Sequence, residues 1–165
     1  MRQELGLPAC GPLCPWQLAA HLGFLVVPLS HYKAAVPWAV AHFQSRLGQR
    51  EFSAITSPRG YVPLIIHNDS HPKDRQASNI AHELAHALLL HPPMPAVDTN
   101  GFRQYNATFE EEANWLGPAL LVSDEAAVWA VRQELTVAAA AIIYGVSKQV
   151  MQMRINVSGA RKRAA

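Results

Sequence analysis

Two histidines four residues apart, with a glutamate directly after the first, interrupt a stretch rich in Ala and Leu, "NIAHELAHALLLHPP" (79–93). On an α-helix such residues lie about 40° apart around the axis, so His82 and His86 can both reach one ion. Zinc accepts imidazole nitrogens and keeps an open position for water in catalytic sites. Glu83 lies about 100° from His82, close enough to act on that water as a general base. The pattern predicts a hydrolytic zinc site.

The same residues have a structural interpretation, a buried helix that carries histidines by chance, because an HExxH match alone is short. Two imidazoles and a carboxylate on an apolar helix are costly to bury unless each finds a polar partner. A metal ion supplies that partner, which favours the zinc site.

A third ligand is needed, and His91 is a poor candidate. If the helix continues to that point, His91 lies about 140° from the face that His82 and His86 share. We interpret it as a residue at the C-terminal end of the helix, favoured there by the helix dipole. The longer pattern HExxHxxGxxH also fails, because its last two fixed positions hold Leu89 and Pro92.

Three adjacent carboxylates downstream, in "TFEEEANWLGPALL" (108–121), offer better candidates. Glu110 is favoured, because Asn114 lies four residues later on the same helical face and could accept the second ring N–H of a ligating histidine. Glu112 is the competing ligand, and Glu111 is the least favoured.

The elements around these motifs predict one α+β domain over residues 1–165, mostly helical with a small antiparallel sheet. Strands are expected at 24–28, 52–56 and 61–66, the last two forming a hairpin across the turn 57–60. Pro63 should place part of the last strand at a sheet edge. Helices are expected at 15–22, 36–47, 76–91, 108–121 and 123–134, with two short helices in 136–157 separated at Gly145. Thr108 is the expected N-cap of the glutamate helix, with Glu111 as its capping-box partner.

The composition excludes two classes of protein. Half of the residues are apolar, 16% are charged and the net charge is +2, so neither disorder nor a nucleic-acid-binding polycation is indicated. Cys10 and Cys14 have no further cysteine pair with which to form a zinc knot, and we expect free thiols. The basic run 161–163 is expected to be a solvated end. Without a secretion signal or membrane span, the chain is expected to be cytoplasmic.

Two segments together resemble a known family. The order "DRQASNIAHELAHALLLH" (74–91) and then "EEEANWLGPALLV" (110–122) is similar to the ImmA/IrrE family of metallo-endopeptidases, over about residues 52–158. The resemblance implies a zincin-like fold of the gluzincin type, with Zn²⁺ held by His82, His86 and Glu110 and with Glu83 as the catalytic base. It favours Glu110 over Glu112, because Glu110 and Asn114 look like the E-x-x-x-D pair of gluzincins. It also implies a cytoplasmic protease that cleaves a repressor-type transcription regulator during stress or mobile-element induction.

The sequence departs from the family pattern at three places, none of which is a proposed ligand. Ala85 stands where a glycine is usual, His91 comes one residue later than the usual histidine, and Gly117-Pro118 replaces a pair of small residues. Pro118 can kink the glutamate helix.

Peptide hydrolysis also needs a donor for the developing oxyanion, and the candidates are Tyr61, His71 and Tyr105. The edge of the hairpin over 61–67 could bind an extended substrate by strand addition.

A rival function comes from the C-terminal stretch "AIIYGVSKQVMQMRI" (141–155), which resembles the turn of a helix-turn-helix within a possible subdomain over 134–157. In a DNA reader the polar residues of its second helix would face the major groove: Lys148, Gln149, Gln152 and Arg154. In a packing module, Met151 and Met153 would instead be core residues. The alternative function is therefore a non-enzymatic regulator, with a structural metal site, that binds DNA or a repressor partner.

Overall fold

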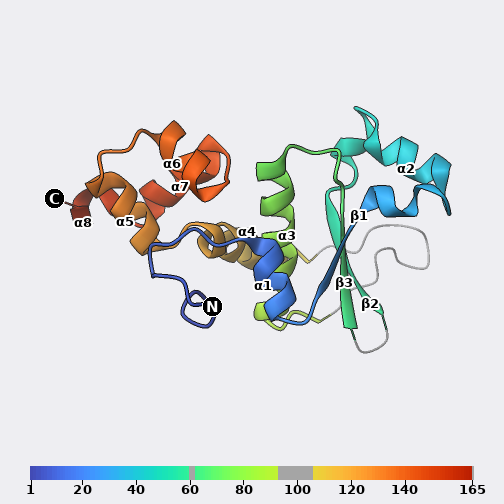
Figure 1. The fold of residues 1–165 in the computed structure, drawn as a ribbon, viewed down its shortest axis with the longest axis horizontal. Helices are drawn as coiled ribbons and strands as arrows, with labels where there is room; N and C mark the ends of the chain where they lie inside the picture. Colours follow the sequence, from blue (N-terminus) through green and yellow to red (C-terminus); the bar gives the residue numbers. More distant parts are fainter. Residues whose placement is uncertain (60–61, 93–105, 165) are drawn as a thin grey trace.

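The computed structural model describes residues 1–59, 62–92 and 106–164, which form a helical protein with one small sheet (Figure 1). The helices before the site are α1 (Pro15–His21) and α2 (Pro37–Gln44), with 3₁₀ turns η1 (Leu29–Lys33) and η2 (Gly48–Arg50) on either side of α2. The site helices are α3 (Lys73–Leu88) and α4 (Ala107–Leu121). Four shorter helices complete the described chain: α5 (Asp124–Arg132), α6 (Val137–Tyr144), α7 (Lys148–Val157) and α8 (Ala160–Ala164). The predicted α+β class is confirmed.

The sheet has the order β1-β3-β2, with β1 at Leu25–Pro28, β2 at Ala54–Arg59 and β3 at Val62–His67. The hairpin prediction is confirmed, because β2 and β3 pair antiparallel. The prediction of a purely antiparallel sheet is wrong, since β1 pairs with β3 in parallel and makes the sheet mixed. The β3 strand is therefore central. The start of β3 pairs with β2 alone, because the pairing with β1 begins only at Leu64. Pro63 lies in this part and pairs with Pro58 of β2, so its predicted edge position is confirmed.

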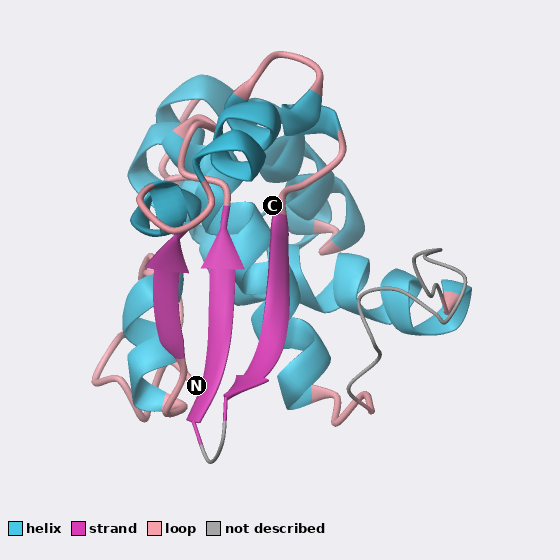
Figure 2. Ribbon diagram, turned by 90° about the vertical axis from the view of Figure 1, so that its right-hand side faces the viewer, coloured by secondary structure: helices cyan, strands magenta, loops and turns pink. Residues whose placement is uncertain are grey.

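Helices cover one face of the sheet, behind the strands in Figure 2. Val26, Ile65 and Thr56 are register partners across the three strands, so their side chains share a face. Ile65 is fully buried and packs in a core with residues of α1 and α3, namely Leu18, Ile80 and Leu84. This packing places α3 directly over the sheet.

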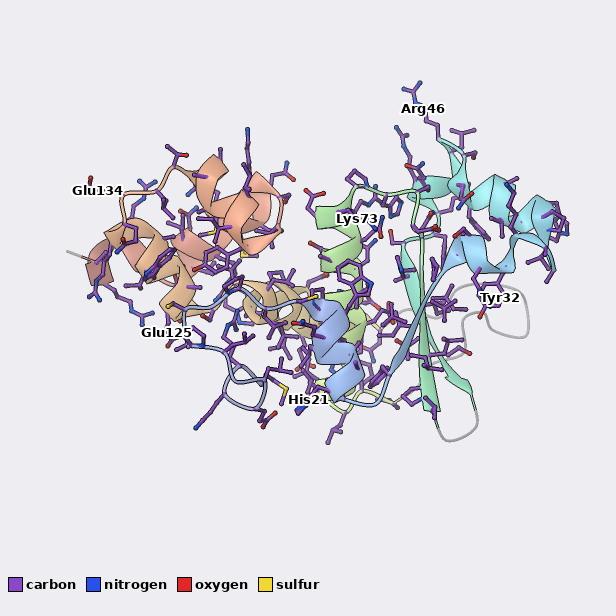
Figure 3. The ribbon with its side chains drawn as sticks, viewed as in Figure 1. His21, Tyr32, Arg46, Lys73, Glu125 and Glu134 are labelled. Carbon is purple, nitrogen blue, oxygen red and sulfur yellow. The ribbon has the colours of Figure 1, made fainter. Side chains whose placement is uncertain are left out.

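A second core joins the end of α4 to the C-terminal helices, at the left of Figure 1. Leu121, Met151 and Tyr144 are buried in it, which confirms the core interpretation of Met151. Hydroxyl side chains cap the helices α5, α6 and α7 at their N-termini: Ser123, Thr136 and Ser147. Gly145, as predicted, separates α6 from α7 and has a positive φ of 61°. Outside the cores, charged side chains such as Arg46 and Glu134 point outward (Figure 3).

Several predicted boundaries shift for local reasons. Helix α2 ends at Gln44, because Ser45 is already extended. The segment 57–59 is strand rather than turn, and it pairs with β3. Helix α4 is capped by Asn106 instead of Thr108, since the Asn106 side chain accepts hydrogen bonds from the amides of Thr108 and Phe109. The basic run 161–163 lies in α8, and its residues are exposed, as expected of a solvated end.

None of the described helices has the length and apolar character that a membrane span requires. Cys10 and Cys14 are free, as predicted.

Candidate metal centre

The two helices that carry the predicted ligands pack against each other, and a glycine allows their close approach. A Cβ atom added to Gly117 of α4 would lie 3.2 Å from the Cα and from the N of His82. Gly117 is seven residues from Glu110, two helical turns along the same face of α4. Gly117 is one of the residues that depart from the family pattern. Its lack of a side chain lets α4 pack closely on α3, which favours the placement of Glu110 beside His82. Helix α4 continues through Pro118 to Leu121.

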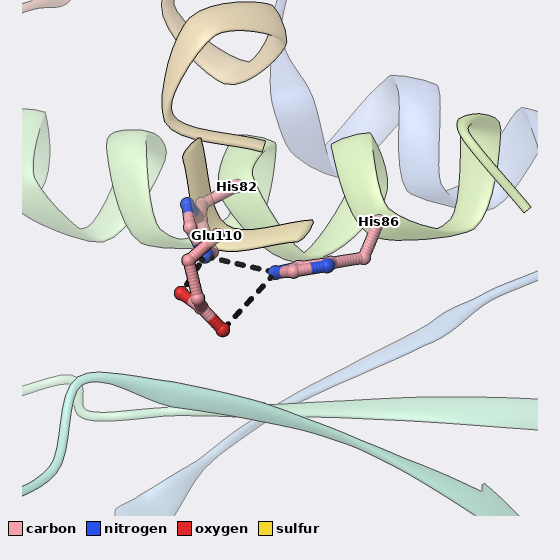
Figure 4. A group of neighbouring side chains, drawn as sticks. All are labelled: His82, His86 and Glu110. Carbon is pink, nitrogen blue, oxygen red and sulfur yellow. Dashed lines mark hydrogen bonds and ion pairs between the residues drawn. The ribbon is translucent and has the colours of Figure 1, made fainter. Parts of the chain in front are cut away.

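His82, His86 and Glu110 converge on one point (Figure 4). The Nε2 atoms of the two histidines are 3.1 Å apart. Glu110 lies beside both, with one carboxylate oxygen 3.2 Å from His82 Nε2 and the other 3.7 Å from His86 Nε2. One ligand atom from each residue can be chosen so that all lie within 4.8 Å of one another.

These residues fit a metal ion by their chemistry. Two ring nitrogens that face each other at 3.1 Å and share a carboxylate concentrate lone pairs at one point. Burial, and next the neighbouring His82, lower the pKa of His86, which favours the neutral imidazole that a metal needs. Two imidazoles and one carboxylate also leave room in a four-coordinate shell for water or substrate.

Glu83 reaches the sheet instead of joining this cluster. The hydroxyl of Thr56, on β2, donates a 2.6 Å hydrogen bond to the Glu83 carboxylate. Burial raises the pKa of Glu83, while the Thr56 hydrogen bond and the charge of His86 act in the opposite direction. The sequence motif contains no signal for Thr56, because its contact with Glu83 depends on how the sheet and α3 pack.

His91 has a role that the sequence pattern did not predict. It lies beyond the end of α3, and its ring contacts His86, with the two Nδ1 atoms 2.8 Å apart. Its other ring nitrogen donates a 2.8 Å hydrogen bond to Glu112. The prediction that His91 only ends the helix is therefore wrong, because the angle of 140° applies only if the helix continues, and α3 stops at Leu88.

The other candidates from the sequence are placed differently. Glu112 contacts His91 and is not part of the three-residue cluster. Asn114 is exposed and makes no described contact with either histidine. The ring contact with a candidate ligand that was expected of Asn114 is made by His91 instead, on His86.

The candidate oxyanion donors are placed as follows. His71 is buried, with its ring nitrogens occupied by the Gln49 carbonyl and the Asn79 amide, and it is not available as an oxyanion donor. Tyr61 and Tyr105 lie outside the described residues.

The candidate DNA-binding residues do not share one surface. Lys148 and Gln149 are exposed and Gln152 is half-buried. Arg154 is buried, donating to the Val122 carbonyl and forming a 2.5 Å ion pair with Asp124. The expectation that Arg154 faces a groove of DNA is therefore wrong.

Two histidines on one helix, a carboxylate from a second helix and an extra glutamate beside them are an arrangement typical of one class of protein, the metal-dependent hydrolases. A family model described as the IrrE N-terminal-like domain of peptidase M78 matches residues 43–156. The chain therefore belongs to this peptidase family, as the resemblance predicted. No curated protein and no solved structure matches the chain.

Membership of the family makes the chain a metallopeptidase by class and implies a metal ion. The His82, His86 and Glu110 cluster is where the described residues could hold one.

Proposed function

We propose that the protein is a zinc-dependent endopeptidase that hydrolyses a peptide bond in a repressor-type regulatory protein. The observation that carries the proposal is Glu83, a partly buried carboxylate next to three metal-compatible ligands. A purely structural metal site has no use for such a group. The ligand assignment is His82, His86 and Glu110.

The donor set supports zinc. Imidazole nitrogens suit zinc, copper, iron and nickel, whereas oxygen-only shells suit magnesium and calcium. A His₂Glu set with an open position is a zinc arrangement of known hydrolases. A bound metal would supply Lewis-acid polarisation of the scissile carbonyl.

Glu83 supplies the proton transfers. It accepts a proton from the attacking water, and then donates that proton to the nitrogen of the leaving amine. Because burial raises the pKa of Glu83, the carboxylate is a stronger base than an exposed glutamate and its acid form is a usable donor. The hydrogen bond from the Thr56 hydroxyl fixes the Glu83 carboxylate in place, which supports this role.

The sheet offers a binding edge for an extended substrate, but not the edge expected from the sequence. The central strand β3 has neighbours on both sides from Leu64 to His67, so it cannot accept a further strand there. Among the described residues, the edge strand beside the site is β2, which carries Thr56. We place the substrate along β2, and single N-methylation of backbone amides near the scissile bond of a cleaved peptide should slow its cleavage.

A repressor as substrate, and a cytoplasmic location, rest on the resemblance to ImmA/IrrE proteins. The testable form is cleavage of the transcriptional repressor encoded nearest to this gene. A peptide library analysed by mass spectrometry is the second probe, because it reports cleavage sites whatever the natural substrate is.

The deciding experiment compares wild type with Glu83→Gln, with Glu111→Gln as the matched control on an exposed glutamate. Zinc content should be close to one ion per chain in all three proteins. Cleavage should fall by about 10²-fold or more in Glu83→Gln, and stay unchanged in the control.

Two outcomes would contradict the proposal: a wild-type protein that binds no zinc, or equal cleavage by wild type and Glu83→Gln. Zinc binding without any cleavage by wild type would favour the rival function, a regulator with a structural metal site. Salt-dependent binding to duplex DNA would then test its DNA-binding form.

A further inference from the structure

A chain of two hydrogen bonds leads from a proposed metal ligand to the protein surface. The Nδ1 atom of His86 is 2.8 Å from Nδ1 of His91, and Nε2 of His91 is 2.8 Å from the Glu112 carboxylate. The His91 side chain is only 6% exposed, whereas that of Glu112 is 51% exposed. The series therefore ends in a carboxylate that water can reach.

Only one arrangement of protons satisfies both hydrogen bonds and leaves His86 able to bind a metal. His86 needs its Nε2 lone pair for the metal, so its proton must be on Nδ1. That N–H then donates to Nδ1 of His91, which must carry its own proton on Nε2. The Nε2–H of His91 in turn donates to Glu112, because an ionised carboxylate only accepts.

The backbone brings His91 to this position through an uncommon conformation. Leu90 has a positive φ of 57°, which is unfavourable for a residue with a branched side chain. The turn closes with a 3.0 Å hydrogen bond from the His91 amide to the His86 carbonyl. The His91 ring then stacks on Phe109 of α4, with centroids 4.5 Å apart and planes at 19°. Both helices of the site therefore hold the ring in place.

We propose that His91 and Glu112 are positioning residues that hold His86 in the tautomer and ring orientation required for metal binding. The inference rests on the proposed function only in taking His86 as a ligand. Neither residue belongs to the cluster of His82, His86 and Glu110. Their effect acts through His86, and outer partners of this kind strengthen metal binding by about 10–100-fold.

Zinc affinity, measured by competition with a chromophoric chelator, tests this role without reference to cleavage. His91→Phe keeps a ring for stacking on Phe109 but removes both nitrogens, and should weaken zinc binding by about 10–100-fold. His91→Asn places an oxygen where Nδ1 was and should recover most of that loss. Glu112→Ala should weaken binding more than Glu111→Ala, which removes a carboxylate from the same helical turn.

Each protein is also studied without metal, by thermal unfolding and by long-range ¹H–¹⁵N spectra of the imidazoles. Wild type should show His86 protonated at Nδ1, and His91→Phe should lose this preference. Zinc affinity in His91→Phe equal to wild type, or a wild-type His86 protonated at Nε2, would overturn the proposal. If His91→Phe does not fold, the Glu112→Ala and Glu111→Ala pair decides, and equal affinities overturn it.

The two proposals fail in different ways. A wild-type protein that binds no zinc contradicts the proposed function, while the metal-free spectra still report on His86 and His91.

Discussion

At the scale of single residues, two features of the structure shift the pKa of Glu83 in opposite directions. Burial raises the pKa of its carboxyl group, and the hydrogen bond from Thr56 favours the ionised form. The result is a carboxylate that is both basic and fixed in orientation, which is what proton transfer from water requires. The residue that fixes it lies on the strand that we propose as the substrate-binding edge.

Thr56→Val should therefore reduce cleavage by about tenfold without loss of zinc, since it keeps the shape of the side chain and removes only the hydroxyl. The measurement is kcat/KM on a peptide selected from the library, with zinc content determined in parallel. Ser57→Ala is the control, because successive strand residues point to opposite faces. An equal loss of kcat/KM in both variants would mean that the substitutions disturb β2 as a whole, and that the Thr56 hydroxyl has no specific role.

The residues of the site differ in how far the sequence alone could predict them. His82 and His86 could be paired because helical spacing is a local property, and the structure brings both rings together. Glu110 needed the second motif, and it does lie beside them. Thr56 and His91 could not be predicted, because one contact depends on sheet packing and the other on a turn that reverses the expected direction of a side chain.

At the scale of elements, the end of α3 is the feature that decides the surroundings of His86. Leu89 still has right-handed helical angles, whereas Leu90 adopts a left-handed conformation at which glycine is common. Leu90 is also 87% exposed, so its side chain contributes little packing to offset the strain.

Leu90→Gly should therefore leave the protein as stable or raise its free energy of unfolding by up to about 1 kcal/mol, because the left-handed strain is removed. Leu89→Gly at the neighbouring position should instead lower stability by about 0.5–1 kcal/mol, since no strain is relieved there. Urea unfolding of the metal-free proteins measures both. A Leu90→Gly protein less stable than Leu89→Gly would show that the turn does not store strain.

In the sheet, the pairing of strands close in sequence could be predicted, whereas the pairing of distant strands could not. The hairpin of β2 and β3 follows from two neighbouring β-rich runs. The parallel pairing of β1 with β3 joins Leu25 to Leu64 across α2, and nothing local to either strand specifies that partner. Because this pairing makes β3 central, the candidate substrate edge is β2 rather than β3.

At the scale of the whole molecule, buried histidines make the fold sensitive to acid. Burial lowers the pKa of His67 and of His71. A histidine whose pKa is lower in the folded than in the unfolded protein binds a proton more readily after unfolding. Its contribution to stability is therefore complete above the ordinary value of 6.5 and is lost as the pH falls from there towards the lowered pKa.

His71→Gln should be less stable than wild type near neutral pH, because the contacts with Gln49 and Asn79 are lost. It should also lose less stability than wild type between about pH 7.5 and about pH 5.5, where an ordinary histidine titrates. Urea unfolding with a chelator present measures both, and His31→Gln is the exposed control. A pH dependence as steep as that of wild type would exclude His71 as a source of acid sensitivity.

The metal cluster also joins two large parts of the molecule, because His82 and His86 belong to the helix over the sheet while α4 continues into the C-terminal core. Zinc that binds only the folded state should stabilise it by about 2.7 kcal/mol at a free concentration of 100 times Kd. For a chain of this size that corresponds to a rise in Tm of roughly 5–10 °C. Glu110→Ala should abolish most of the rise, whereas Glu111→Ala should keep it. A rise of equal size in both variants would show that zinc binds elsewhere, and no rise in wild type would contradict a metal shared between α3 and α4.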